Sequence, residues 1–134
     1  MKPDLLELAV AVGADNAWVG AVTGIHDGDT VHVGVVDPLL SIPVVLAVRI
    51  LGVNARELSE PGGIEARAAL TAELPVGTVV TLRGVRSDKY AGRIVSAVIT
   101  AAGVDVGGWL VANGWAAPWN GTGPKPVPDW PRGT

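Results

Sequence analysis

The order of extended and helical stretches constrains the fold of this chain more than any other feature. Three apolar, β-branched runs come first, a stretch with helical spacing follows, and two more β-branched runs come after it. Glycine, proline and aspartate separate the runs, which is typical of short strands joined by tight turns. The predicted strands cover residues 18–25, 30–36, 44–53, 78–85 and 93–100. A chain of 134 residues has room for one domain built from them.

The stretches between and within these runs carry signals of their own. The Asp-Gly pair at residues 27–28 predicts a hairpin turn between the first two strands. The third run, residues 44–53, is apolar almost throughout, which predicts a strand buried on both faces. Small apolar residues recur at helical spacing over residues 64–72, so a helix of about three turns is expected there. A second short helix is expected within residues 104–116.

Five strands with one helix between the third and the fourth are the order expected of a Greek-key barrel of the OB type. We therefore predict a mainly β fold with some α structure, namely a five-stranded barrel and two short helices. The barrel domain is expected to span residues 17–117, after an N-terminal segment of residues 1–16. The tail, residues 118–134, is rich in proline and glycine and is predicted to lack regular structure. Because such barrels serve binding proteins and enzymes alike, the polar residues must indicate the function.

The composition excludes several classes of function. The chain has no cysteine and two histidines, which excludes a disulfide scaffold, a thiol nucleophile and a thiolate zinc site, and argues against a multi-histidine metal centre. A net charge of −3 and a pI of about 5.2 argue against a generic cationic coat for nucleic acids. The charge is uneven, however: residues 1–48 carry −5, residues 49–93 carry +2, and residues 94–134 are neutral. The acidic total therefore leaves room for a basic site in the middle of the chain.

The sequence contains no candidate membrane span and no recognisable secretion signal. The longest apolar stretch, residues 42–53, is interrupted by Pro43 and Arg49 and is shorter than the roughly 20 residues of a helical span. The N-terminus carries acidic residues before a short apolar run, rather than the basic start of a signal peptide. We therefore expect no membrane association, and a location in the cytoplasm or in an assembly such as a bacteriophage virion.

Polar residues gather in three clusters at strand ends. The first is Asp-Gly-Asp-Thr at residues 27–30, the second is Arg49 with Asn-Ala-Arg-Glu at residues 54–57, and the third is residues 88–93 around Tyr90. Taken singly, each cluster fits a turn, a structural ion pair or a solvated loop. A guanidinium within an apolar strand, such as that of Arg49, needs a partner, and a structural carboxylate serves as well as a bound phosphate.

Together the three clusters resemble the staphylococcal nuclease (thermonuclease-like) family over residues 18–117. The motifs follow in the family's order: Asp-Gly-Asp-Thr-Val, then Val-Arg-Ile-Leu-Gly-Val followed by a small residue and glutamate, then Gly-x-Glu-Ala, Asp-Lys-Tyr and Gly-Arg. The stretch of residues 106–116 looks like the family's second helix. Each motif is weak by itself, whereas their ordered combination is specific. The family fold is an OB-type barrel with helices, in agreement with the prediction from the strand order.

The resemblance implies a metal-dependent nuclease that hydrolyses phosphodiester bonds of DNA or RNA, typically with calcium. In the family pattern, Asp29 supplies a carboxylate, Asn54 a side-chain oxygen and Ala55 a backbone carbonyl to the cation. Oxygen ligands of this kind are those that a hard cation prefers. The metal polarises the scissile phosphate and helps to orient the attacking water.

The same resemblance implies roles for the charged and aromatic side chains. Arg49 and Arg93 match the arginines that hold the phosphate and neutralise charge in the transition state. Glu57 matches the acidic residue that acts as general base or positions the water. Lys89 and Tyr90 match positions near a terminal phosphate or sugar of the bound strand.

The chain departs from the family pattern within the candidate site. Asn54 stands where the family commonly has aspartate, so a weaker calcium site is expected because affinity follows ligand charge. Arg56 replaces a proline, where it can pair with Glu57 or bind a substrate phosphate. Ala91 is inserted between Tyr90 and the following glycine, which shifts the turn that aims the second arginine.

The C-terminal tail keeps an alternative function open. The family's long C-terminal helix has no counterpart in residues 118–134, which instead carry Trp119 and Trp130. These indoles either anchor a protein partner or pack on the chain's own barrel. The alternative to a nuclease is a non-catalytic OB module, either a nucleic-acid binder or a structural component of a larger assembly such as a phage virion.

Overall fold

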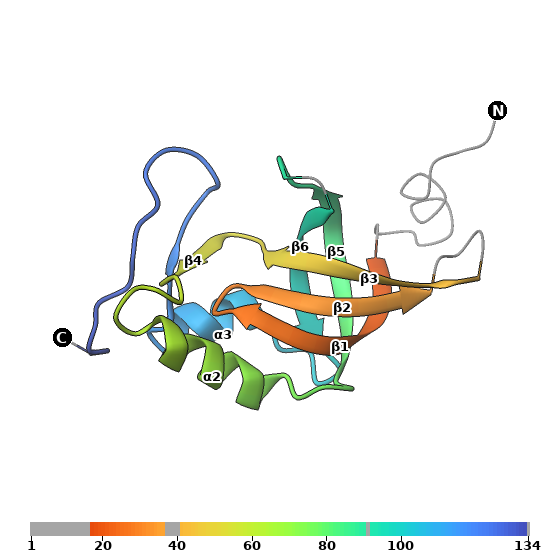
Figure 1. Ribbon diagram of the computed structural model, residues 1–134, viewed down its shortest axis with the longest axis horizontal. Coiled ribbons are helices and arrows are strands. Elements are labelled where there is room, and N and C mark those ends of the chain that lie inside the picture. Colours follow the sequence, from red (N-terminus) through yellow and green to blue (C-terminus); the bar gives the residue numbers. More distant parts are fainter. Residues whose placement is uncertain (1–16, 37–40, 91, 134) are drawn as a thin grey trace.

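The computed structural model describes residues 17–36, 41–90 and 92–133 (Figure 1). The predicted N-terminal segment, residues 1–16, and the inserted Ala91 lie outside these ranges. The long strands are β1 (Ala17–Asp27), β2 (Thr30–Val36), β3 (Pro43–Ile50), β5 (Val79–Ser87) and β6 (Arg93–Thr100). They form a closed barrel in the order β1-β2-β3-β6-β5, in which β5 also pairs with β1.

The strand directions identify the type of barrel. β3 and β6 pair in parallel, whereas the other neighbours in the barrel are antiparallel. A three-stranded meander whose last strand pairs in parallel with the fifth barrel strand is the arrangement of an OB-type barrel. The helices α2 (Gly63–Glu73) and α3 (Val106–Ala112) and a pair of short strands, β4 (Val53–Ala55) and β7 (Ala116–Pro118), complete the described elements. The predicted fold class is therefore confirmed.

Valines fill the interior of the barrel. Val22, Val31, Val33, Val48 and Val98 are each at most 1% exposed. Their branched side chains suit the inner face of a pleated strand, and burying each contributes roughly 1.5–3 kcal/mol. α2 packs against β1 and closes one side of this core (Figure 1). The polar clusters are left at the strand ends, where loops position them.

The prediction for the third strand is wrong in two respects. Residues 44–53 are not one strand, because the backbone turns at Leu51 and Gly52 before Val53 begins β4. Gly52 has a φ of 83°, a left-handed conformation that glycine adopts without strain. Nor is β3 buried on both faces: Val45 is 63% exposed, because alternate residues of a barrel strand face outward.

Both predicted helices exist, but the second is shorter than the pattern indicated. α3 covers only the middle of residues 104–116, because Gly114 ends it with a φ of 77°. The backbone N–H groups of Gly114 and Trp115 donate to the carbonyls of Val111 and Leu110, at 3.1 and 2.9 Å, which is a Schellman cap. Within the described ranges, no helix is long and apolar enough to span a membrane.

The segment after β7 contains no helix or strand up to residue 133, as predicted for the tail. In Figure 1 this dark blue segment rises beside β4, turns, and comes back toward the start of α2. It therefore runs along the end of the barrel that carries the β3–β4 turn and the loop after β4.

Candidate active site

The turn between β1 and β2 places Asp29 against β4. Gly28 makes this possible, because a Cβ at this position would lie 2.9 Å from the Cβ atoms of both Ala55 and Ala66. The backbone N–H of Asp29 donates to Asp27 Oδ1 at 3.1 Å, which fixes the turn. The N–H of Ala55 then donates to Asp29 Oδ2 at 2.9 Å. The carboxylate of Asp29 is consequently buried between the turn and β4.

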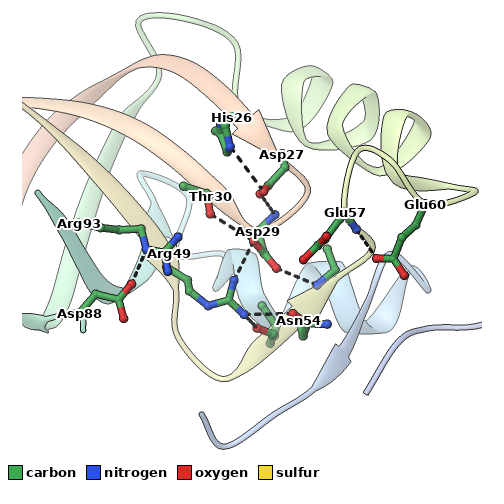
Figure 2. Close-up of polar contacts among 12 residues, drawn as sticks. His26, Asp27, Asp29, Thr30, Arg49, Asn54, Glu57, Glu60, Asp88 and Arg93 are labelled. Carbon is green, nitrogen blue, oxygen red and sulfur yellow. Dashed lines mark hydrogen bonds and ion pairs between the residues drawn. The ribbon is translucent and has the colours of Figure 1, made fainter. Parts of the chain in front are cut away.

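Arg49 links Asp29 to Asn54 at the end of β3. Its NH1 lies 3.0 Å from Asp29 Oδ1, and its NH2 donates to Val53 O and Asn54 Oδ1 at 3.2 Å each. Figure 2 shows the guanidinium between the two side chains. Thr30 adds a hydroxyl bond to Asp29 Oδ1 at 3.2 Å. The arginine side chain is only 12% exposed, so these contacts hold one edge of its planar guanidinium in place.

The environment of Asp29 disfavours its charged form. Burial raises the pKa of its carboxyl, and the charge of Asp27 raises it further, while Arg49 and the N–H of Ala55 lower it less. The net result is a pKa above the ordinary value of an aspartate. Loss of hydration is the main cause, and a bound cation would favour the charged form of this carboxyl.

The predicted calcium ligands lie together and fit a hard cation by chemistry. Asp29 bonds directly to Ala55, and its side chain shares the Arg49 guanidinium with that of Asn54. Among the described residues, no three or more His, Cys, Asp or Glu side chains form a group that could hold a metal ion. The three candidate ligands consist instead of one carboxylate, one amide oxygen and one backbone carbonyl. Asn54 is engaged at both ends, since its Nδ2 donates to Pro126 O at 2.8 Å. A cation would share Asn54 Oδ1 with the arginine, which favours weak binding.

Arg93 lies at the start of β6, opposite Ala47 of β3 and therefore two residues along from Arg49. Its Nε forms an ion pair with Asp88 Oδ2, and its guanidinium carbon is 4.7 Å from the centroid of the Tyr90 ring. Burial tends to raise the pKa of Asp88, but the hydrogen bond and charge of Arg93 outweigh it and lower the pKa. Lys89 Nζ is also within 5.3 Å of the Tyr90 centroid. The tyrosine ring therefore has two cations around it.

An open pocket of about 340 Å³ joins the two arginines. Its charged and aromatic lining residues are Arg49, Arg86, Asp88, Lys89, Tyr90, Arg93, Trp119 and Lys125. The structure thus brings Arg49, Lys89, Tyr90 and Arg93, predicted from separate clusters, to one cavity. Five cations and one carboxylate line it, so the basic excess of the middle of the chain is concentrated here.

Glu57 lies on the exposed loop after β4 and is outside the pocket lining. Its backbone N–H donates to Glu60 Oε1 at 2.7 Å, and Figure 2 shows its carboxylate pointing toward the Asp29 side of the site. Gly63 allows this loop to lie against the start of α2, because a Cβ there would overlap the carbonyl oxygen of Glu57. Arg56 points to the tail instead, where its Nε donates to Pro128 O at 2.9 Å.

Sequence reasoning missed Arg86 of β5 and four tail residues that line the pocket, of which Trp119 and Lys125 lie near Arg49 or its neighbours. The guanidinium carbon of Arg49 lies 5.3 Å from the Trp119 ring centroid, and Lys125 Nζ lies 5.6 Å from the same ring. Trp130 contacts the barrel side as well, since its ring centroid is 6.2 Å from that of Trp115. Both tail indoles thus pack on the chain itself, the second of the two arrangements expected. The pairing of β7 with β4 leads the tail to this site, and no residue spacing signals that pairing.

Comparison with models of known protein families gives no match, and comparison with curated protein sequences gives none either. The likeness to the staphylococcal nuclease family therefore rests on the ordered motifs, and the OB-type barrel agrees with it.

Proposed function

We propose that this chain is a divalent-cation-dependent nuclease, with calcium as the metal, that hydrolyses phosphodiester bonds in DNA or RNA. The observation that carries the proposal is the meeting of Arg49 and Arg93 at one cation-lined pocket, with the buried Asp29 behind Arg49. Two guanidinium forks facing one cavity suit a phosphate with several oxygens, because each fork can donate paired hydrogen bonds. Their positive charge also stabilises the extra negative charge of a phosphoryl transition state.

The other residues have roles that follow from their positions. Glu57, on the exposed loop beside Asp29, accepts the proton of the attacking water or orients that water. Lys89 and Tyr90 line the Arg93 side of the pocket and bind a neighbouring phosphate and sugar. Asp29, Asn54 and Ala55 would hold the cation, which when bound supplies Lewis-acid polarisation of the phosphate.

The test is cleavage of single-stranded DNA, double-stranded DNA and RNA with calcium, and with EDTA in its place. We expect cleavage only with the cation, and a loss of about 100-fold or more in the Glu57→Gln variant, because general-base catalysis is worth that much. Glu65→Gln, an exposed carboxylate on α2, is the matched control and retains full activity. Absence of cleavage by the native chain with calcium and manganese, up to mildly alkaline pH, would refute hydrolysis.

One observation favours a second candidate, a nucleic-acid-binding OB module without catalysis. Asn54 is tied to Arg49 and to Pro126, so the one amide among the candidate ligands already has protein partners at both ends. Such a module binds oligonucleotides with and without calcium and cleaves neither DNA nor RNA. Its place in a larger assembly is tested by size-exclusion chromatography with light scattering, in which a lone monomer argues against a partner at Trp119 and Trp130.

A further inference from the structure

The C-terminal segment, residues 119–132, is fixed to the candidate site at its start. The backbone N–H of Trp119 donates to Gly52 O at 2.8 Å, and its indole Nε1 donates to Thr122 O at 3.0 Å. Asn120 Oδ1 accepts hydrogen bonds from both the N–H and the hydroxyl of Thr122, each at 2.9 Å. The loop that carries the indole is therefore held by its own hydrogen bonds and by the β3–β4 turn.

The same segment is anchored again further along. Asn54 and Arg56 donate to its carbonyls at Pro126 and Pro128, as described above. At the far end, Trp130 packs so closely on Gly62 that a Cβ there would lie 2.6 Å from the indole ring. Side chains of the candidate site thus serve as attachment points for the segment.

Two of its side chains enter the pocket. The ring of Trp119 lies against the guanidinium of Arg49. The same guanidinium forms the ion pair with Asp29 and donates to Asn54. A cation within about 6 Å of an indole face is attracted by the ring, so the indole helps to fix the position of the guanidinium. Lys125 is exposed and brings its ammonium group to the pocket wall beside the same indole.

The charges of the pocket fall into two groups. Arg49 and Arg93 each form an ion pair with an aspartate. Arg86, Lys89 and Lys125 form no ion pair with a carboxylate in the part of the chain that the structure describes. Three uncompensated cations around one cavity exceed what a single phosphodiester requires, and they match a strand with consecutive phosphates.

We propose that the C-terminal segment is a substrate-binding element, in which Lys125 contacts a phosphate next to the one held by Arg49 and Arg93, and Trp119 is a positioning residue for Arg49. This inference rests on the proposed function and extends it, because it identifies the ligand as an oligonucleotide strand rather than a single nucleotide. It also gives the tail a role within the chain that needs no protein partner.

The test of Lys125 is the salt dependence of binding to a fluorescent oligothymidylate of about eight nucleotides, a length within the usual site size of an OB fold. Fluorescence anisotropy is measured in EDTA, and again in calcium with Glu57→Gln as the parent chain, so that no cleavage occurs. Lys125→Gln is expected to lower the slope of log K against log salt by about 0.7, the value for one phosphate contact on a single strand. Arg67→Gln, an exposed cation on α2, is the matched control and leaves the slope unchanged.

The test of Trp119 compares a variant without an aromatic ring with one that keeps a ring. Trp119→Leu is expected to weaken binding about two- to tenfold, the range of one cation–π contact, whereas Trp119→Phe recovers most of that loss. A merely structural role predicts equal losses in both variants. Circular dichroism melting of each variant shows that it is folded.

The outcomes separate this inference from the proposed function. If the native chain binds the oligothymidylate under neither condition, both are refuted. If the native chain binds but Lys125→Gln keeps the native affinity and slope, only the role of the segment is refuted. If binding responds to Lys125 as expected and no cleavage occurs in calcium or manganese, hydrolysis is refuted and the segment remains a substrate-binding element.

Discussion

Two arginine–aspartate pairs flank the same pocket, and they are held in different ways. The Arg49–Asp29 pair lies inside a network that includes Asn54 and the C-terminal segment, and its arginine side chain is 12% exposed. The Arg93–Asp88 pair lies at facing ends of β5 and β6, and its arginine side chain is 29% exposed. One pair is therefore a structural element as well as a candidate phosphate site, whereas the other depends on a single carboxylate and one ring.

The difference shows that two arginines with the same proposed chemical role can contribute very differently to the free energy of unfolding. Removing one member of a buried pair leaves a charge without its partner, which is expensive, whereas solvent near a partly exposed pair reduces that cost. Loss of activity alone does not separate these cases, because both arginines face the phosphate in the proposed function. Stability measured beside activity does.

The largest effect is expected for Arg49→Gln. This change leaves the carboxylate of Asp29 buried beside Asp27 with no cation, so we expect the free energy of unfolding to fall by about 3–5 kcal/mol. Arg93→Gln is the matched variant, and it should cost no more than about 1 kcal/mol. Urea denaturation followed by circular dichroism measures both.

Activity should respond to the two arginine variants in the same way. Each loss is expected to reduce cleavage by about 100-fold or more, the usual cost of one donor to a developing negative charge. Equal destabilisation by the two variants would show that the Arg49 network contributes no more than the Arg93–Asp88 pair, and the comparison would then be wrong.

A smaller effect is expected from an added methyl group on each side of the pocket. Gly63→Ala forces a Cβ onto the carbonyl of Glu57, so the loop must shift, at a cost of about 2–3 kcal/mol. Gly92→Ala, on the Arg93 side, meets no atom within 4 Å and only the strain of a φ of 79°, about 1 kcal/mol. Thermal melting gives both stabilities, and cleavage assays show whether Glu57 has moved. Similar losses in both variants would mean that the Glu57 loop is free to adjust.

Much of the fold could be predicted from the sequence because the signals are local. The β-branched runs and one helical stretch sufficed for the OB-type barrel, and residues 119–133 of the Pro/Gly-rich tail lack helix and strand as expected, although Pro118 belongs to β7. The same logic failed at Gly52, where an apolar run continues through a turn that only the left-handed glycine reveals. The apolar character of Val45 likewise could not show that it is exposed, because exposure depends on which face of the strand points out of the barrel.

The candidate site was predicted as three clusters, and the missing part is long-range. The resemblance to the nuclease family implied that Arg49 and Arg93 share one site, and both side chains line the same pocket. The contacts of Trp119 and Lys125 depend on β7 pairing with β4, which joins segments more than sixty residues apart without a local signal. Arg56 was predicted to bind Glu57 or phosphate, but a tail carbonyl accepts its bond, and no composition rule indicates that acceptor.

The smallest effects concern the two aspartates, whose pKa shifts have opposite directions. The pKa of Asp29 is raised by burial and Asp27, so its ionisation lowers stability as pH rises from the unfolded value of 3.8 through the folded pKa. Although burial acts the other way, the pKa of Asp88 is lowered by Arg93, so this pair stabilises the fold above 3.8 and loses that contribution as pH falls through the folded pKa. Relative to the native chain, Asp29→Asn should therefore gain stability as pH rises. Asp88→Asn should lose up to about 1 kcal/mol as pH rises from the folded pKa of Asp88 to 3.8.

Urea denaturation from about pH 3 to 8, in EDTA so that no cation occupies the site, measures both differences. Opposite slopes of the free-energy difference against pH would show that burial and Asp27 outweigh Arg49 at Asp29, whereas Arg93 outweighs burial at Asp88. Slopes of the same sign would mean that Arg49 outweighs burial at Asp29 as Arg93 does at Asp88. In that case Asp29 needs no bound cation to stay ionised, and the non-catalytic module becomes the better account of the pocket.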